Sequence, residues 1–590
     1  MTLATKRLVD DLGVLVAGQG GDGSLTVVSL LGTLLGRRGF HTYTAREVAS
    51  RTKGGHAAAL MRASTVARAC LGDRVDLLVA FDEEAVERTG HRLADDGIVV
   101  FDSSAGPRPA GFLPAGATVL EVPLARIAVH SHRRDLFKNS VAFGLVARIV
   151  GLSDDEAVGM LRERFRRLGD GAIRSNLRAL ETGFEVAEQH GYASGSGPWR
   201  LAPVERAERL LITGNEAIAL GFLAAGGRFF AGYPITPATE ILTWLQSHLP
   251  AFGGLAVQAE DELSAVNLAI GAAMTGARSM TASSGPGIAL MQEGISHAGA
   301  AEIPLVIVDC QRSGPSTGMP TKPEQGDIGM LAHGSTGDFP RVVLAPGDAT
   351  DCFSLAIAAT NLAQEFQGPV YIALDQALGQ DSATSEPFDL ATATTTIGKR
   401  LSAAEVEGLS ELRRYVVTDD GISPWAAPGT PGGMSLMTGN EHNEWGLVSA
   451  APRNRVEMMD KRMRKLDAIR DRLPAGREWG DPAAPIGLLG VGMTTGVISE
   501  AAERLAVAGV PVACLQPRTV WPVPEQTVEF IRSHARVYVV EHNAEGQMAQ
   551  LLAAAGAPRE ALRSVLKYDG TPFRPGELVS RILAEEEMSR

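Results

Sequence analysis

Short apolar runs separated by amphipathic stretches recur along the chain and predict alternating strands and helices. The run LGVLVA (12–17) predicts a buried strand, GQGGDG (18–23) follows it, and the periodic stretch SLTVVSLLGTLLGRR then predicts a helix that ends at Gly39. Further strands are predicted at DLLVAF (76–81), GIVVF (97–101) and TVLEVP (118–123). Such alternation indicates an α/β unit with a parallel sheet, which we expect to span residues 1–192.

The same alternation resumes after a Ser/Gly/Pro-containing linker, residues 193–204. A second unit, 205–395, contains predicted strands RFFAGY (228–233), SMTASS (279–284), PLVIVD (304–309) and PVYIALD (369–375). A loop-rich segment, 396–480, includes the charged stretch 453–473, which predicts a solvated helix or a partner-facing arm. A third unit, 481–590, contains IGLLGVG, VPVACLQP and RVYVVEH. The predicted fold class is α/β, with several doubly wound domains built on parallel sheets.

Composition excludes several classes of protein. The 590 residues carry 68 acidic and 55 basic side chains, so the formal net charge of −13 speaks against a nucleic-acid binder. The chain has four cysteines and no CxxC, which argues against a thiolate-ligated iron–sulfur cluster held by this chain alone. So few, isolated thiols are also typical of a protein in a reducing compartment. We expect a cytoplasmic protein with no membrane contact, because the sequence contains neither a signal-peptide pattern nor a long uninterrupted apolar run.

The glycine-rich segment GQGGDG is the first candidate binding motif. Gly18, Gly20 and Gly23 match GxGxxG between a predicted strand and a predicted helix, with Gly21 beside them. The next predicted strand offers Thr42 and Tyr43 where a ribose would need a carboxylate, which disfavours NAD. Two interpretations of the segment remain open: a tight turn that binds no ligand, and a site for a phosphate-bearing ligand at the helix N-terminus.

A second possibility for the same segment is the Mg²⁺ clamp of a thiamine diphosphate site. That clamp pairs an aspartate with an asparagine a short distance downstream, both acting as oxygen ligands. The first asparagine after Asp22 is the distant Asn139, whereas Asn176 lies too close to the other GDG, 169–171. We therefore predict no metal site in this chain.

Three segments of the second unit are candidates for a ligand site, because each follows a predicted parallel strand. GYPITPATE (232–240) holds Thr236 between two prolines, either as a ligand contact or as a helix cap in a rigid turn. Three acidic residues, 260–262, precede a helix of small residues and can also serve as partners of its dipole. SSGPG (283–287) follows the next strand. Arg312 follows another strand, where it can either bind a ligand carboxylate or form a surface salt bridge.

Together these motifs resemble one family. YPITP, EDELSA, SSGPG, QRSGPSTGMPT, GISPWAAPGTPG, TGNEHNEWG (438–446) and EHNAEGQ (541–547) resemble the alpha subunit of 2-oxoacid:ferredoxin oxidoreductases. GQGGDG and TKGGHAAALMR (52–62) resemble the family's gamma domain, and the gamma-then-alpha order is similar to the fused subunit of the 2-oxoglutarate enzymes. The resemblance covers nearly the whole chain.

The resemblance implies a fold and a partner. It implies a gamma domain, a thiamine-pyrimidine-binding domain and a transketolase C-terminal-like domain. It also implies a beta subunit that supplies the Mg²⁺–diphosphate motif and a 4Fe–4S cluster, in a heterotetramer of two alpha and two beta chains. Ferredoxin would then accept the electrons.

The resemblance also implies residue roles. Glu262, with Glu260 as second choice, is expected to bind N1′ of the coenzyme's pyrimidine, a role for which a carboxyl needs an apolar pocket. Thr236 is expected near the reacting carbon and Arg312 on the substrate carboxylate. The coenzyme contacts expected beside Glu262 are Tyr233, Pro234, Ile235, Ser284 and Gly285. The contacts expected for coenzyme A are Gly18, Gly20, Gly21, Gly23, Lys138 and Asn139.

The implied activity is CoA-dependent oxidative decarboxylation of a 2-oxoacid. The fused layout and the 438–446 loop favour 2-oxoglutarate, giving succinyl-CoA, while pyruvate and branched-chain 2-oxoacids remain alternatives. Two further hypotheses are an NAD-linked dehydrogenase built on GQGGDG and a non-catalytic nucleotide- or CoA-binding scaffold. Thr236, Glu262 and Arg312 argue against the scaffold.

Overall fold

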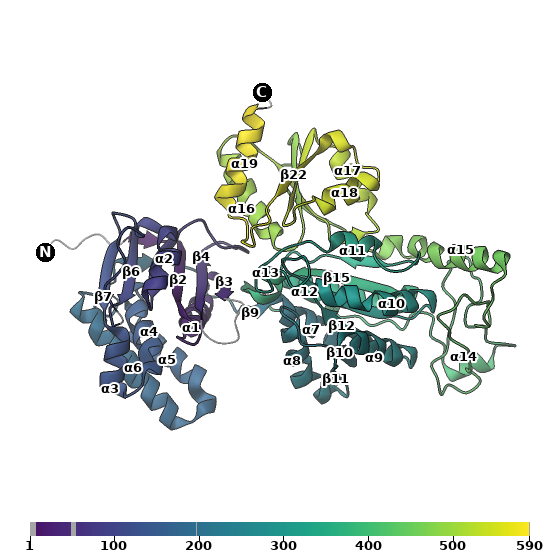
Figure 1. Ribbon diagram of the computed structural model, residues 1–590, viewed down its shortest axis with the longest axis horizontal. Coiled ribbons are helices and arrows are strands. Elements are labelled where there is room, and N and C mark those ends of the chain that lie inside the picture. Colours follow the sequence, from purple (N-terminus) through teal and green to yellow (C-terminus); the bar gives the residue numbers. More distant parts are fainter. Residues whose placement is uncertain (1–6, 49–54, 105, 196, 589–590) are drawn as a thin grey trace. The chain divides into compact units, whose positions relative to one another are not determined.

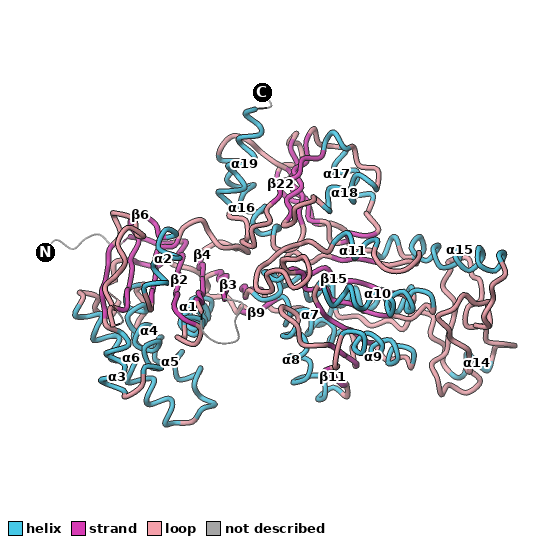
Figure 2. The backbone as a smooth tube through the Cα atoms, viewed as in Figure 1, coloured by secondary structure: helices cyan, strands magenta, loops and turns pink. Residues whose placement is uncertain are grey.

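The computed structural model describes residues 7–48, 55–104, 106–195 and 197–588, which form two compact units (Figures 1 and 2). The first unit contains the described residues up to Ile212, together with Asp381–Pro387 and Arg574–Gly576. The second contains Thr213–Gln380, Phe388–Phe573 and the described residues from Glu577 onward. In the described part of the chain no helix is both long enough and apolar enough to cross a bilayer.

An eight-stranded sheet forms the centre of the first unit, in the order β7-β6-β5-β2-β4-β3-β16-β9. Its strands are β2 (Asp11–Gln19), β3 (His41–Val48), β4 (His56–Ser64), β5 (Val75–Ala80), β6 (Leu93–Asp102), β7 (Thr118–Val122), β9 (Leu210–Thr213) and β16 (Ser382–Ser385). A separate pair joins β1 (Arg7–Val9) to β8 (Trp199–Leu201). The helices are α1 (Ser24–Arg38), α2 (Glu83–Thr89), α3 (Leu124–His132), α4 (Lys138–Ile149), α5 (Asp154–Phe165) and α6 (Asp170–Gln189).

The predicted strand–glycine–helix sequence at the start of this unit is confirmed. β2 is almost wholly buried, and α1 follows the glycine loop with Val27, Leu31 and Leu35 in the core. The helix ends where Gly39 takes a φ of +109°, a conformation that glycine adopts without steric cost.

The expectation of a wholly parallel first sheet is wrong for half of it. Strands β2, β5, β6 and β7 are parallel, but β4 runs antiparallel to both β2 and β3, and β16 runs antiparallel to β3. The connection 49–55 between β3 and β4 is shorter than the dozen or so residues that a parallel crossover needs. Part of TKGGHAAALMR, residues 52–54, lies outside the described residues.

A seven-stranded sheet forms the centre of the second unit, in the order β11-β10-β12-β13-β15-β14-β20. Its strands are β10 (Phe229–Gly232), β11 (Leu255–Gln258), β12 (Ser279–Ser283), β13 (Leu305–Gln311), β14 (Val342–Leu344), β15 (Pro369–Asp375) and the antiparallel edge strand β20 (Thr519–Trp521). The helices are α7 (Gly214–Ala224), α8 (Thr239–His248), α9 (Glu262–Met274), α10 (Gly285–Ala300), α11 (Ile328–His333), α12 (Ala349–Phe366) and α13 (Gln376–Gln380). The predicted parallel strands are confirmed here.

A smaller sheet follows near the C-terminus, in the order β17-β19-β18-β21-β22. Its strands are β17 (Arg477–Gly480), β18 (Ile486–Gly490), β19 (Ala513–Gln516), β21 (Arg536–Glu541) and β22 (Leu562–Leu566). Its helices are α16 (Thr494–Val507), α17 (Glu525–Arg532), α18 (Gln547–Ala554) and α19 (Pro575–Met588). Residues of this sheet and of the seven-stranded sheet share one hydrophobic core, so they form one body.

The charged stretch 453–473 forms α15 (Pro452–Ala468), in a segment that otherwise holds the short α14 (Ala403–Glu407) and long loops. The predicted helix is confirmed, but its description as solvated is wrong for one face. Lys461, Arg462 and Lys465 are buried, because Glu302 and Glu441 offer them carboxylates at the surface that the helix covers.

Candidate functional site

The loops that carry the predicted ligand residues meet at one edge of the seven-stranded sheet. β10, β12 and β13 are adjacent parallel strands, so the loops that follow them are neighbours. Residues 233–237 follow β10, Ser284 follows β12, and Arg312 follows β13. The tertiary structure therefore brings together segments that lie far apart in the sequence.

Glu262 is the only one of the three consecutive acidic residues that enters the interior. Asp261 caps α9 by accepting a hydrogen bond from the backbone N–H of Ser264 (2.7 Å), and it stays exposed, as does Glu260. Glu262, at the first helical position, is 5% exposed. Its Oε1 accepts a hydrogen bond from the Ser283 hydroxyl (3.3 Å). Of the two predicted candidates, only Glu262 has the burial that a pyrimidine contact requires.

The first turn of α10 lies against this carboxyl. A Cβ atom added to Gly287 would lie 1.9 Å from Ser283 Oγ and 2.6 Å from Glu262 Oε1. Real Cβ contacts are never that short, so only glycine fits at this position. Ser284 precedes α10 at the N-cap position without a capping hydrogen bond, and its buried hydroxyl has no hydrogen-bond partner among the described residues.

Thr236 and Arg312, the two residues predicted to contact substrate, lie in contact. Arg312 Nη1 donates to the backbone carbonyl of Thr236 (2.7 Å). Arg312 is 9% exposed, and its Nε has no partner among the described residues. Burial lowers its pKa, while the carboxylates of Asp327 and Glu262 act in the opposite direction. A buried guanidinium with a free donor is suited to a carboxylate ligand.

A tight turn holds Thr236 in place. The carbonyl of Ile235 accepts hydrogen bonds from the backbone N–H groups of Ala238 (2.8 Å) and Thr239 (3.0 Å). Pro234, Ile235 and Thr236 are half-buried, and Tyr233 is 38% exposed. The turn thus presents these side chains at the mouth of the site rather than in the core.

The glycine loop of the first unit has its own cluster of polar side chains. Gly21 and Gly23 have φ values of +104° and +88°, and Lys138 Nζ forms an ion pair with Asp22 (2.8 Å). Asn139 packs against Gly23, where an added Cβ would collide with it. Lys138, expected to be an ordinary surface lysine if it binds no ligand, is 8% exposed. Burial lowers its pKa, but Asp22, Asp135 and Asp102 together outweigh this effect and raise the pKa.

Comparison with known proteins identifies the family. The model "Pyruvate ferredoxin/flavodoxin oxidoreductase" matches residues 13–186, "Pyruvate flavodoxin/ferredoxin oxidoreductase, thiamine diP-bdg" matches 221–461, and "Transketolase, C-terminal domain" matches 482–584. Subunit alpha of 2-oxoacid:ferredoxin oxidoreductase 2 from Aeropyrum pernix is 31% identical over 98% of both chains. The 2-oxoglutarate oxidoreductase subunit KorA from Mycobacterium tuberculosis is 32% identical over 86% of this chain and 80% of its own. The chain is an alpha subunit of the 2-oxoacid:ferredoxin oxidoreductase family.

A solved structure agrees over the whole length of this alpha subunit. The 2-oxoglutarate:ferredoxin oxidoreductase from Magnetococcus marinus, with 2-oxoglutarate, coenzyme A and succinyl-CoA bound, matches with a TM-score of 0.90. It is 34% identical, and the match covers 98% of this chain and 100% of that one. The α/β domains inferred from the sequence are therefore confirmed.

Sequence reasoning missed two carboxyls in this oxidoreductase subunit. Asp309 is fully buried on β13, and neither of its oxygens has a hydrogen-bond partner among the described residues. Asp327 precedes α11, and its backbone N–H donates to Gln311 Oε1 (3.1 Å). The available signal was an acidic residue at the inward-facing end of the apolar run PLVIVD.

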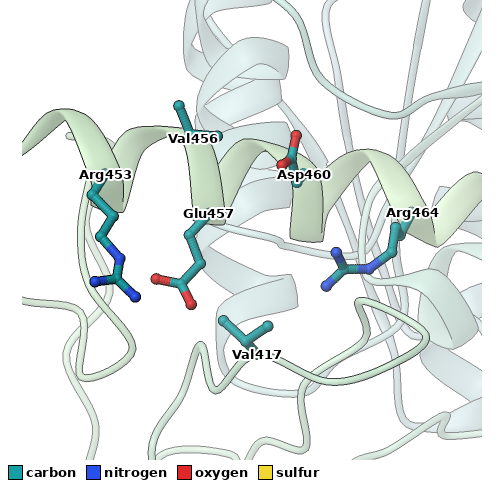
Figure 3. A pocket seen from close by; sticks show the side chains of 6 residues that line it. All are labelled: Val417, Arg453, Val456, Glu457, Asp460 and Arg464. Atoms are coloured by element: carbon teal, nitrogen blue, oxygen red, sulfur yellow. The ribbon is translucent and has the colours of Figure 1, made fainter.

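A shallow pocket on α15 of the oxidoreductase subunit is separate from these residues. It lies between the helix and the loop at Val417 (Figure 3). Its lining residues are Val417, Arg453, Val456, Glu457, Asp460 and Arg464. None of the predicted site residues lines this pocket.

The described residues contain no group of three or more His, Cys, Asp or Glu side chains that could hold a metal ion. The four cysteines, Cys70, Cys310, Cys352 and Cys514, are buried, and none of them forms a disulfide. Burial raises the pKa of Cys514 to about 12 and that of Cys310 well above its ordinary value. The thiols of Cys514 and Cys310 are therefore protonated, as expected for packing residues.

Proposed function

We propose that this chain is the alpha subunit of a 2-oxoglutarate:ferredoxin oxidoreductase. The enzyme would convert 2-oxoglutarate and coenzyme A into succinyl-CoA and CO₂ and pass two electrons to ferredoxin. The observation that supports this most strongly is the full-length likeness, at 34% identity, to the Magnetococcus marinus enzyme with these ligands bound. The KorA relative is also named for 2-oxoglutarate.

The described site fits the pyrimidine end of thiamine diphosphate. A buried carboxyl, Glu262, packs against the first turn of α10 at Gly287, and burial is what a carboxyl needs in order to contact the pyrimidine nitrogen. The unpartnered hydroxyl of Ser284 and the loop 233–235 supply polar and apolar contacts nearby. When bound, the coenzyme would supply the nucleophilic carbon for addition to the keto group of the substrate. Glu262 would hold a proton on the ring nitrogen N1′ and so favour the reactive tautomer.

Arg312 and Thr236 would bind the 2-oxoacid. Arg312 keeps its Nε free for a substrate carboxylate while its Nη1 is fixed on the Thr236 carbonyl. Because the guanidinium is buried, its attraction for a carboxylate is weakly screened by water. The Thr236 side chain would then lie near the reacting carbon.

Coenzyme A is proposed to use the glycine loop of the first unit. Lys138, Asn139 and the amides of residues 18–23 form a polar cluster of the kind that binds phosphate groups. An anionic ligand must compete with Asp22, which already pairs with Lys138. We therefore expect this contact to strengthen binding only modestly.

A beta subunit is proposed to complete the enzyme. The alpha-subunit relatives imply such a partner, and the described residues contain no metal-binding cluster. We propose that the partner holds the Mg²⁺–diphosphate end of the coenzyme and a 4Fe–4S cluster, in a heterotetramer. Pyruvate and branched-chain 2-oxoacids remain the alternative substrates.

The test is co-expression of the chain with its beta subunit and assay of viologen reduction with coenzyme A. The panel of substrates is 2-oxoglutarate, pyruvate and a branched-chain 2-oxoacid, with the highest kcat/KM expected for 2-oxoglutarate. Glu262→Gln should lower kcat at least a hundredfold, because the amide cannot hold the ring proton in the same way. Glu260→Gln is the matched control and should leave kcat within about twofold, since Glu260 is exposed.

Two results would contradict the proposal. If the Glu262→Gln variant turned over all three acids at wild-type rates, Glu262 would not have the role assigned to it. A complex that binds coenzyme A but reduces no acceptor with any 2-oxoacid would favour the non-catalytic scaffold.

A further inference from the structure

We propose that Asn215 is a positioning residue, which holds the loop that carries Thr236 in the geometry that the substrate requires. This inference rests on the proposed role of Thr236 near the reacting carbon. Asn215 lies in the first turn of α7, within the stretch TGNEA (213–217), which the chemistry described above does not use. The residue is 0% exposed, so its amide must find all its partners inside the protein.

The first observation is a direct hydrogen bond from Asn215 to the loop. Its Nδ2 donates to the backbone carbonyl of Pro237 (2.9 Å). Arg312 Nη1 donates to the preceding carbonyl, that of Thr236 (2.7 Å). Two successive carbonyls of the loop are thus each held by a side chain from another part of the fold. The backbone that follows Thr236 cannot rotate without breaking at least one of these bonds.

The second observation is that both ends of the Asn215 amide have partners. Its Nδ2 also donates to Glu240 Oε2 (3.4 Å), and its Oδ1 accepts from the thiol of Cys310 (3.6 Å). Because the nitrogen faces two oxygens and the oxygen faces a thiol, only one orientation of the amide is favourable. Cys310 lies on β13, two residues before Arg312. One amide therefore connects the loop after β10 to the strand that leads to the arginine.

The third observation is that the first turn of α7 is itself held tightly. Thr213 and Glu216 form a capping box at the start of the helix. A Cβ added to Gly214 would lie 2.4 Å from a backbone oxygen of α13, and one added to Gly379 would lie 3.1 Å from Asn215 Oδ1. The side chain of Asn215 therefore extends from a rigid base and has little room to move away from the loop.

These contacts predict which step of catalysis depends on Asn215. Without the amide, the carbonyl of Pro237 loses its side-chain partner and the loop gains freedom near Thr236. A displacement of about 1 Å at a reacting group is enough to slow catalysis severely. Arg312 would keep its bond to the Thr236 carbonyl and its Nε for the substrate carboxylate. The loss should therefore fall on kcat and not on KM.

The test uses the chain assembled with its beta subunit and measures viologen reduction with 2-oxoglutarate. Asn215→Ala should lower kcat about tenfold and change KM by less than about threefold. Amide hydrogen exchange at residues 235–239 should become faster. A merely destabilised protein would contain less active enzyme, but exchange would not increase at this loop in particular.

Asn361→Ala is the matched control, because Asn361 on α12 makes the same kinds of bond elsewhere. Its Nδ2 donates to the carbonyl of Thr394 (2.9 Å), and its Oδ1 accepts from Arg278 (2.9 Å), which directly precedes β12. This is the edge of the sheet opposite to the site. The control should keep kcat within about twofold and leave exchange at 235–239 unchanged.

A double-mutant cycle tests whether Asn215 acts through Thr236. Thr236→Ala alone should lower kcat about tenfold, and Asn215→Ala added to it should lower kcat by less than about twofold more, because the group to be positioned is already absent. A merely structural role would slow both backgrounds by the same factor. If Asn215→Ala does not assemble, Asn215→Ser takes its place in the cycle, with an expected loss of about threefold because the hydroxyl keeps one donor.

Equal slowing in both backgrounds would overturn the positioning role, as would a wild-type kcat in Asn215→Ala; either result leaves the proposed function intact. A wild-type kcat in Thr236→Ala would overturn the roles of both residues. If the wild-type complex reduced no acceptor with any 2-oxoacid, the proposed function would fail. Hydrogen exchange at 235–239 would then still show whether Asn215 holds the loop.

Discussion

At the scale of single residues, the site depends on the absence of side chains in the first turn of α10. Gly285 leaves room for Asp327, and Gly287 leaves room for Ser283 and Glu262. Neither glycine needs a positive φ, so the constraint is space and not backbone conformation. The two glycines of SSGPG are therefore needed so that the carboxyls of Asp327 and Glu262 and the hydroxyl of Ser283 can pack against this turn.

We expect Gly287→Ala to disable the site. The added methyl would push Ser283 and Glu262 apart, at a cost of about 1–3 kcal/mol in the free energy of unfolding and a large loss of kcat. Urea unfolding and the viologen assay measure the two effects.

Gly271→Ala is the matched control, because Gly271 lies in the exposed middle of α9 with open space where the Cβ would be. It should stabilise the chain by up to about 1 kcal/mol and leave kcat unchanged. Equal activity of the two alanine variants would contradict this account of α10.

At the scale of elements, α15 is held by buried charges. Lys461 Nζ lies 2.6 Å from Glu302 Oε1, and Lys465 pairs with the other oxygen of the same carboxylate, all fully buried. Burial alone would raise the pKa of Glu302, but Lys461, Lys465 and Arg414 hold it well below its ordinary value. Burial lowers the pKa of Lys465 to about 7. The Glu302 carboxylate therefore binds lysines from two successive turns of α15, a helix that the charged sequence alone predicts to be exposed to solvent.

Glu302→Gln should be strongly destabilising, because it leaves two buried ammonium groups without a counter-charge. We expect a loss of about 3–5 kcal/mol near pH 6. The loss should shrink as pH rises from about 7 to 10, because the unfolded lysines bind protons that the folded ones release, so rising pH favours the folded variant. Urea unfolding across this range measures it.

Glu457→Gln provides the control on α15 itself. Glu457 lines the exposed pocket of Figure 3, and its replacement removes one negative charge, as Glu302→Gln does. It should change the free energy of unfolding by less than about 0.5 kcal/mol at every pH. A loss as large as that of Glu302→Gln would mean that the net charge matters and not the buried cluster.

At the scale of the whole molecule, the segment 543–547, after β21, holds the segment 325–329, at the start of α11, in place. Gln547 accepts from the backbone N–H of Gly329 (2.9 Å) and donates to the carbonyl of Gly326 (2.7 Å). Asn543 Nδ2 donates to the carbonyl of Gln325 (3.1 Å). The motif EHNAEGQ thus fixes the backbone on both sides of Asp327.

Gln547→Ala should loosen this segment without unfolding the domain. Loss of two hydrogen bonds is expected to cost about 1–3 kcal/mol, with faster amide hydrogen exchange at residues 326–329 and a lower kcat. Gln550→Ala is the control, since the exposed Gln550 side chain bonds only within its own helix region, to the carbonyl of Glu545. Unchanged exchange at 326–329 in the Gln547 variant would refute the positioning role.

The sequence by itself determined the order of strands and helices, the three α/β domains and the family. These follow from local periodicity, from turn residues such as Gly39, and from short motifs whose spacing is written in the chain. The sequence also ranked Glu262 above Glu260, and the burial of Glu262 agrees with that ranking.

Only the tertiary structure decided which side chains meet. The hydrogen bond of Ser283 to Glu262, the contact of Arg312 with Thr236 and the burial of Lys461 depend on strand order and helix packing. The antiparallel β3 and β4 likewise depend on pairing across the sheet. A local pattern cannot predict such contacts, because the free energy of burying a charge or a carboxyl depends on partners that are remote in sequence.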